Sequence, residues 1–277
     1  MKTLLITATL FSIFQISSAQ NISGKATYLS KLKMEDQLDL EKQNIPEGLR
    51  GLISAAIKSE TEKEYTLVFN STESLFKEAE KVNNNISNNS GISVQTMVVE
   101  YDQAGGEHLY KDLKNSTYTE QALSFDKKFL ITDSIPKINW VLTKETKHIG
   151  QYKCNKAYYL EEYKAPKSST NLTEFETKTD TVVAWYSPQI PVSNGPKLLG
   201  GLPGFILEYS DSKEVFQCSE IVLNPKEKVI ITKPTKGKKI SAEAFELLMD
   251  KKQKEHMEQI NGLLDGNGNN FQIIIEE

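Results

Sequence analysis

The chain is poor in the residue types that build catalytic and metal sites. Its 277 residues include only three histidines and two cysteines. His108, His148 and His256 lie far apart, and none belongs to a metal-spaced pair such as His-x-x-x-His. No Gly-x-Ser-x-Gly, Walker-type phosphate loop or Gly-x-Gly-x-x-Gly pattern occurs. The sequence therefore predicts no metal and no cofactor, and it points to no catalytic residue.

Long apolar runs are missing except at the N-terminus. Lys2 precedes an apolar run from Leu4 to Ile16, and Ser17-Ser18-Ala19 supplies small residues for cleavage before Gln20. This pattern predicts a signal peptide over residues 1–19. The alternative is a membrane anchor, but the run is shorter than the roughly 20 residues that a spanning helix needs. We expect a protein exported to the periplasm or secreted, with no transmembrane segment in the mature chain.

The chain also lacks a concentration of positive charge. It has 33 Lys and Arg against 37 Asp and Glu, which gives a net charge of −4. Nucleic-acid binding needs clustered cations that neutralise phosphates, so we expect no nucleic-acid partner. Lys236, Lys238 and Lys239 surround Gly237, and we interpret this basic spot as a solvated turn in preference to an anion site.

The two cysteines, Cys154 and Cys218, lie in segments with strand-like composition. In an exported protein such a pair favours a disulfide. The alternative is two buried free thiols. In either case we expect a structural role for both residues.

Strand patterns dominate the rest of the chain. Short alternating segments separated by turn signals every 8–12 residues are typical of an antiparallel sheet. The expected strands are 23–32, 64–70, 108–113, 116–123, 128–132, 139–144, 148–161, 174–186, 205–210 and 215–222. Residues 83–91 are rich in Asn and Ser and predict a mobile loop, and residues 164–172 predict a polar loop. The tail 271–275 could add an edge strand.

Two segments have helical periodicity instead. Pro46 opens a short helix, and residues 241–264 repeat apolar side chains about one turn apart behind Ser241, a suitable N-cap. We expect the second helix to cover the sheet in preference to binding a partner helix. The predicted fold is mainly β (α+β). It is a single domain over residues 20–277, built as one antiparallel curved sheet or half-barrel with both helices packed on it. It resembles periplasmic lipoprotein carriers by analogy only.

The most distinctive stretch runs from Ala184 to Glu208 and combines apolar strand ends with turn-forming residues. Its prolines and glycines are Pro188, Pro191, Pro196, Pro203, Gly195, Gly200, Gly201 and Gly204. Proline cannot sit inside a central strand, so residues 187–204 are predicted to form a stiff connection between two strands. We expect structural roles for Gly195, Gly201 and Gly204. The residues expected to line a binding mouth there are Trp185, Tyr186, Leu202, Pro203 and Phe205; the alternative is a loop folded back over a core.

The segment Gly201-Leu202-Pro203-Gly204-Phe205-Ile206 resembles the motif that gives the GLPGLI family its name. Four further blocks also resemble this family: Tyr110 to Leu113, Ile138 to Trp140, Ile149 to Ala157, and Ala184 to Pro196. The family, also described as Porph_ging-type, comprises exported proteins of Bacteroidetes with no established activity. This chain departs from the motif at Phe205, where the family has a second leucine. The resemblance implies export and supports a structural role for Cys154, but it transfers no catalytic residue.

Three functional hypotheses follow. The first is a non-enzymatic binding protein for an apolar or lipidated ligand. The second is a structural or protein-interaction component of the cell envelope, in which an exposed edge strand pairs with a partner. Because the members of a Ser–His–Asp triad are scattered along a chain, a hydrolase stays a third hypothesis.

Overall fold

The computed structural model of the chain describes residues 22–33, 61–79, 108–166, 175–252 and 255. The predicted signal peptide, the helix predicted from Pro46, the loop 83–91 and the tail 271–275 lie outside these residues. So does the end of the predicted C-terminal helix.

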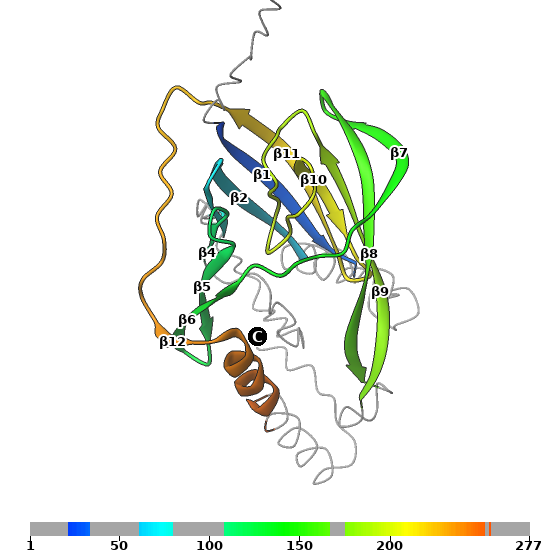
Figure 1. The fold of residues 1–277 in the computed structure, drawn as a ribbon. Helices are drawn as coiled ribbons and strands as arrows, with labels where there is room; N and C mark the ends of the chain where they lie inside the picture. Colours follow the sequence, from blue (N-terminus) through cyan, green and yellow to red (C-terminus); the bar gives the residue numbers. More distant parts are fainter. Residues whose placement is uncertain (1–21, 34–60, 80–107, 167–174, 253–254, 256–277) are drawn as a thin grey trace, which may run out of the picture.

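Twelve strands form one open, strongly curved sheet (Figure 1). In sheet order they are β12, β6, β5, β4, β3, β2, β1, β11, β10, β9, β8 and β7. Their bounds are β1 Ser23–Leu32, β2 Glu62–Asn70, β3 Glu73–Glu78, β4 His108–Asp112, β5 Thr117–Ser124, β6 Lys127–Ser134, β7 Val141–Ile149, β8 Tyr152–Pro166, β9 Phe175–Ser187, β10 Phe205–Ser210, β11 Glu214–Leu223 and β12 Lys238–Ile240. Neighbours pair antiparallel except β12 and β6, which pair parallel. The predicted fold class, mainly β with one curved sheet, is confirmed.

Alternation of side chains explains why these segments form strands. In β1 the buried positions recur every second residue, at Gly24, Ala26, Tyr28 and Ser30. Successive side chains of a strand point to opposite faces, so these residues all lie on one face. The sheet curves around this face, which we call the inner face. The opposite face is the outer face.

Aromatic side chains from distant strands fill the inner face. Tyr65 stacks on Phe76 with ring centroids 5.0 Å apart, and Phe216 lies 5.2 Å from Tyr65. Phe69 packs 4.5 Å from Phe205. Each buried aromatic ring removes a large apolar area from water, so these contacts tie strands β2, β3, β10 and β11 together.

Two strands were not predicted, and two boundaries differ. β3 was missed because it has only six residues and because its pattern, with three consecutive buried residues, does not alternate. β12 lies where we expected a solvated turn, and Lys238 and Lys239 pair with Phe129 and Leu130 of β6. The turn between β7 and β8 falls at Gly150, which has a φ of 55°. β8 extends to Pro166, into the expected polar loop.

The C-terminal helix is described over residues 242–252 and at 255. Ser241 caps it as predicted, because its Oγ accepts a hydrogen bond from the Ala244 amide at 3.2 Å. Phe245 packs edge-on against Phe129 of β6 at 5.3 Å, so the helix covers part of the sheet. None of the helical residues described makes a run long and apolar enough to cross a membrane.

Cys154 and Cys218 are free thiols, so the expected disulfide is wrong. Cys154 lies on β8 and Cys218 on β11, with β9 and β10 between them. Three strand spacings amount to roughly 14 Å along the sheet, and a disulfide needs Cα atoms within about 7 Å. Burial raises the pKa of Cys154 to about 11 and that of Cys218 to about 12. Both therefore stay protonated near neutral pH, and Cys154, which is fully buried, packs as a small apolar residue.

The connection between β9 and β10, residues 188–204, lies against the inner face of the sheet (Figure 1). We call it the inner segment. Its apolar side chains are buried in the same core as the aromatic rings: Ile190, Val192, Leu199 and Leu202. Burying one such side chain contributes about 1.5–3 kcal/mol, so the inner segment is a structural part of the core. Of the two readings of this stretch, the loop folded over a core is the one that the structure shows.

Gly204 closes the inner segment where it re-enters the sheet. Its φ is 156°, and a Cβ atom placed there would lie 2.3 Å from the carbonyl oxygen of Ser187. Because that neighbour is backbone at the end of β9, it cannot rotate away. Only glycine fits this position without moving a strand.

We therefore expect Gly204→Ala to lower the free energy of unfolding by about 1–3 kcal/mol, the range for backbone strain at a special position. Urea denaturation monitored by tryptophan fluorescence measures this change. Gly200→Ala is the matched control, since its nearest atom beyond its chain neighbours would be the Ser193 carbonyl oxygen at 3.5 Å, an ordinary contact. Equal stability of the two variants would contradict the packing described for Gly204.

Candidate functional site

Lys111 of β4 is a fully buried lysine that holds the inner segment. Its side chain is 1% exposed, and its Nζ donates hydrogen bonds to the carbonyl oxygens of Gly195 at 2.8 Å and Leu199 at 3.1 Å. It shares a face with Leu109, two residues earlier, so strand alternation turns both toward the inner face. The lysine gives two buried carbonyl groups a partner that they would otherwise lack.

Burial also governs the charge of this lysine. Removal from water disfavours the ammonium form and lowers the pKa of Lys111 to about 7. The two carbonyl oxygens act in the opposite direction, because they accept from the ammonium. The group therefore titrates far below its ordinary range while it keeps its hydrogen bonds to the inner segment.

Further hydrogen bonds fix the inner segment along its length. Trp140 Nε1 donates to the Gly200 carbonyl at 2.8 Å, and the Gly201 amide donates to Ser193 Oγ at 2.9 Å. The Ile206 amide donates to the Asn194 carbonyl at 2.9 Å. Lys111 and Trp140 come from two of the sequence blocks that carried the family resemblance, so these blocks meet at the inner segment.

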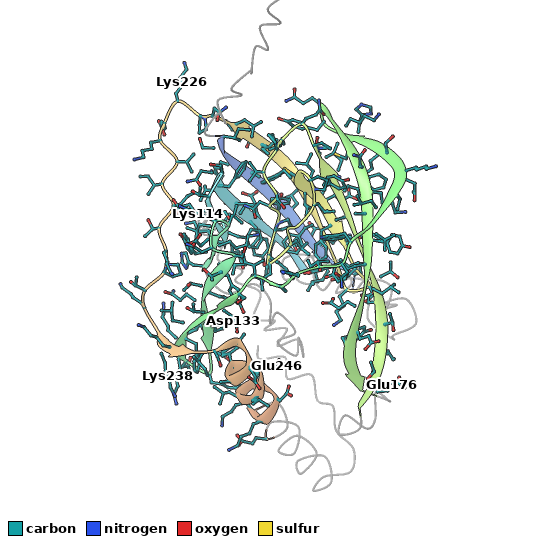
Figure 2. All side chains as sticks on the ribbon, viewed as in Figure 1. Lys114, Asp133, Glu176, Lys226, Lys238 and Glu246 are labelled. Carbon is teal, nitrogen blue, oxygen red and sulfur yellow. The ribbon has the colours of Figure 1, made fainter. Side chains whose placement is uncertain are left out.

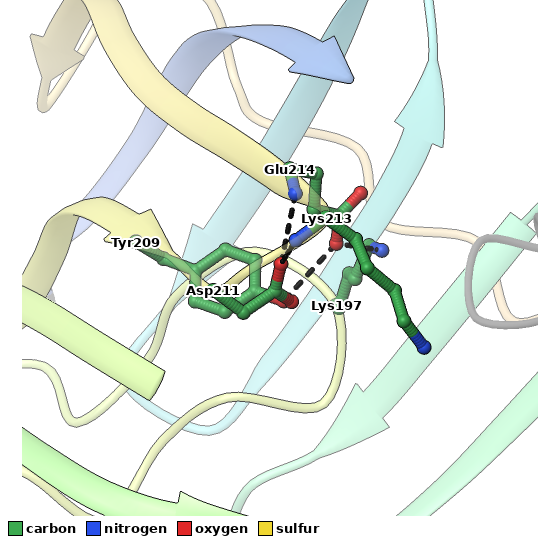
Figure 3. A network of polar contacts seen from close by, with 5 residues as sticks. All are labelled: Lys197, Tyr209, Asp211, Lys213 and Glu214. Atoms are coloured by element: carbon green, nitrogen blue, oxygen red, sulfur yellow. Dashed lines mark hydrogen bonds and ion pairs between the residues drawn. The ribbon is translucent and has the colours of Figure 1, made fainter. Parts of the chain in front are cut away.

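A polar network connects the same segment to the β10–β11 turn (Figure 3). Lys197 of the inner segment forms an ion pair with Glu214 Oε1, and the Tyr209 hydroxyl lies 3.0 Å from that oxygen. The Tyr209 hydroxyl also hydrogen-bonds Asp211, which accepts from the Glu214 amide at 2.8 Å. Burial, then the charges of Glu214 and Asp211, raise the pKa of Tyr209 well above its usual range. The network pairs the charges that burial would otherwise penalise.

Three of the five residues expected to line a mouth are buried. Tyr186, Leu202 and Phe205 are 4%, 2% and 0% exposed and belong to the core. Trp185 is partly exposed, and the Lys147 ammonium lies 4.5 Å from the centre of its ring. Pro203 is exposed. Leu202 lies in the inner segment, while Tyr186 lies near the end of β9 and Phe205 begins β10, and all three pack in the core. Ligand binding by the five residues stays a prediction.

A pocket lies on the outer face instead, beneath the segment 225–237 that joins β11 to β12. We call this segment the strap; Figure 1 shows it beside β4 and β5, and Figure 2 marks it at Lys226, with Lys238 just beyond its end. The pocket has a volume of about 450 Å³. Its lining comes from β2 to β5 and from the strap: Val68, Leu75, Lys77, His108, Gln121, Ile230, Thr232, Lys233, Pro234, Thr235 and Lys236.

His108 is the chemically distinctive residue of this pocket. Its Nδ1 atom is buried and has no hydrogen-bond partner. No serine, aspartate or glutamate lines the pocket within the described part of the chain, so the hydrolase hypothesis gains no support from His108. His148 is exposed on β7. Among the described residues, no group of three His, Cys, Asp or Glu side chains is placed to hold a metal ion.

Sequence reasoning missed the pocket because its residues come from five separate segments. The strap carried one usable signal, the lysines near Gly237, of which Lys236 lines the pocket.

Lys111→Met tests the buried lysine through the pH dependence of stability. Between pH 7 and the unfolded pKa near 10.4, the unfolded chain binds a proton at Lys111 that the folded chain releases, so the contribution of Lys111 to wild-type stability rises with pH. The variant lacks this group. We expect the stability of wild type relative to the variant to increase by up to about 1.5 kcal/mol from pH 7 to about pH 8.5.

Urea denaturation at several pH values measures this difference, and the cysteines and tyrosines cancel because both proteins contain them. A difference that stays constant or falls over this range would show that the folded lysine keeps its ordinary pKa.

Comparison with known proteins finds a family whose model matches part of this chain. A family model described as "Protein of unknown function (Porph_ging)" matches residues 140–208. No curated protein matches the chain. Two solved structures, described as PNGF-II in C2 and P21 space groups, are similar at 16% identity with TM-scores of 0.44 and 0.45. The match covers 81% of this chain and 32% of the solved one, so this chain spans about a third of that length.

The family match begins at Trp140, which anchors the inner segment, and ends at Glu208 in β10. It therefore contains the whole inner segment, and it confirms the resemblance that the sequence motifs indicated. Residues 140–208 are a Porph_ging-type segment, a type for which no function is known.

Proposed function

We propose that this is an exported, non-enzymatic binding protein that takes up a ligand with an apolar part in the pocket beneath the strap. The observation that carries the proposal is the pocket itself. Its volume of about 450 Å³ lies in the range of small-molecule sites. Export is supported by the apolar N-terminal run behind Lys2.

Apolar side chains on both walls support an apolar ligand. Val68 and Leu75 come from the sheet, and Ile230 and Pro234 come from the strap. Ile230 is 77% exposed, which is unusual for a large apolar side chain that the core could have used. A ligand placed between strap and sheet would remove part of this surface from water.

The edges of the sheet give less support to the alternative of a protein-interaction component. β12, at one edge, has only three residues. β7, at the other, carries Lys144 and Lys147 and has a register shift between Leu142 and Thr146. Short edge strands, lysines and bulges are the features by which sheets avoid pairing with other chains. We therefore favour the pocket over the edges.

Ile230→Asp tests the proposal with Nile red, a neutral fluorescent probe. We expect saturable binding to the wild-type protein and at least tenfold weaker binding to the variant, because a carboxylate on the strap replaces apolar contact. Leu160→Asp on β8 is the control, since Leu160 is 63% exposed and does not line the pocket. Absence of saturable binding, or equal loss in both variants, would contradict the proposal.

A further inference from the structure

The charged residues of the pocket all have the same sign. Lys77, Lys233 and Lys236 line it, and no aspartate or glutamate does so among the described residues. The whole chain has a net charge of −4, so this local excess of positive charge is not a consequence of overall composition. Clefts lined by one sign of charge concentrate ligands of the opposite sign.

The three lysines converge from different elements. Lys77 comes from β3, while Lys233 and Lys236 come from the strap. Lys77 has other interactions within the chain, and Lys233 lies 5.5 Å above the ring of Tyr110 on β4. The contact with Tyr110 places the Lys233 ammonium against the outer face of the sheet, beside the pocket that Lys233 lines.

Other polar groups in the same pocket can complete an anion site. His108 Nδ1 is buried without a hydrogen-bond partner, a state that costs free energy unless a ligand supplies the partner. Gln121, which pairs with His108 across β4 and β5, and Thr232 and Thr235 of the strap also line the pocket. Amide and hydroxyl groups of this kind donate to carboxylate or phosphate oxygens.

The apolar walls and the cations belong to one cavity. The strap contributes both apolar side chains, Ile230 and Pro234, and lysines, Lys233 and Lys236. On the sheet, Leu75 and Lys77 are two residues apart in β3 and lie on the same face. A purely apolar ligand would make no use of the lysines and of His108 in the lining. A small hydrophilic anion would leave the apolar walls exposed to water.

We infer that the pocket beneath the strap binds an amphipathic anion, a molecule with a carboxylate or phosphate head group and an apolar chain. This inference rests on the proposed function and specifies its ligand class. The head group pairs with Lys233, Lys236 and His108, and the chain lies against Val68, Leu75 and Ile230.

Calorimetric titration with four probes tests the ligand class: decanoate, decyl phosphate, decanol and acetate. Decanol keeps the chain without the charge, and acetate keeps the charge without the chain. We expect decanoate and decyl phosphate to bind at least tenfold more tightly than either decanol or acetate, and their affinity to fall as salt is raised. Decanol binding as tightly as decanoate would overturn the anion inference and leave the proposed function intact.

Paired lysine variants locate the site. We expect Lys233→Gln with Lys236→Gln to reduce the affinity for decanoate to that for decanol. Lys226→Gln with Lys228→Gln makes the same change in net charge elsewhere on the strap and should leave the preference for decanoate unchanged. Equal losses in the two double variants would overturn the assignment to this pocket. If neither the decyl probes nor Nile red bind, the proposed function itself fails.

Discussion

The ammonium group of Lys111 and the carbonyl oxygens of Gly195 and Leu199 make the contact on which the inner face depends. A 17-residue connection rich in proline and glycine cannot pair its own backbone groups as a strand would, and burial leaves those groups without water. Lys111, Trp140 and Ser193 supply the missing partners. With its polar groups satisfied, the inner segment can place Ile190, Val192 and Leu202 among the aromatic rings of the core.

This arrangement separates the two faces of the sheet by role. The inner face is occupied by the inner segment and the aromatic core. The most distinctive sequence motif of the chain, which contains this segment, therefore serves packing. Among the described residues, the strap lies over the outer face between β2 and β5, and the pocket between them has apolar walls and lysines in its lining. The strands that form the floor of this pocket are held in place by the core packed on their inner face. The strap above the pocket contains Ile230, the most exposed of the large apolar residues described.

Much of the sheet could be predicted from local patterns, because strands such as Ser23–Leu32 alternate strictly and are bounded by turn residues. β3 and β12 could not, since a six-residue strand without alternation and a three-residue exposed one carry no periodic signal. The prolines of the connection 187–204 predicted that it is stiff, but they did not predict toward which face of the sheet it folds. For this reason Leu202 and Phe205 were expected at a mouth. The contacts of Lys111 join residues about 85 positions apart, and the pocket joins residues more than 100 positions apart. No local sequence pattern contains such contacts. The cysteine pair shows the same limit, because only sheet order reveals that two strands separate the thiols.

Native-state hydrogen exchange of the backbone amides of residues 190–206 tests the central claim most directly. In the structure the amides of Ile190, Val192, Asn194, Leu199, Gly204 and Ile206 donate to carbonyl oxygens, and most of these residues are buried. If the inner segment is part of the core, its amides exchange only through openings as costly as those of β1 and β2. Exchange of these amides at the rate of an exposed loop, while β1 and β2 stay protected, would show that the segment moves independently of the sheet and would contradict the account.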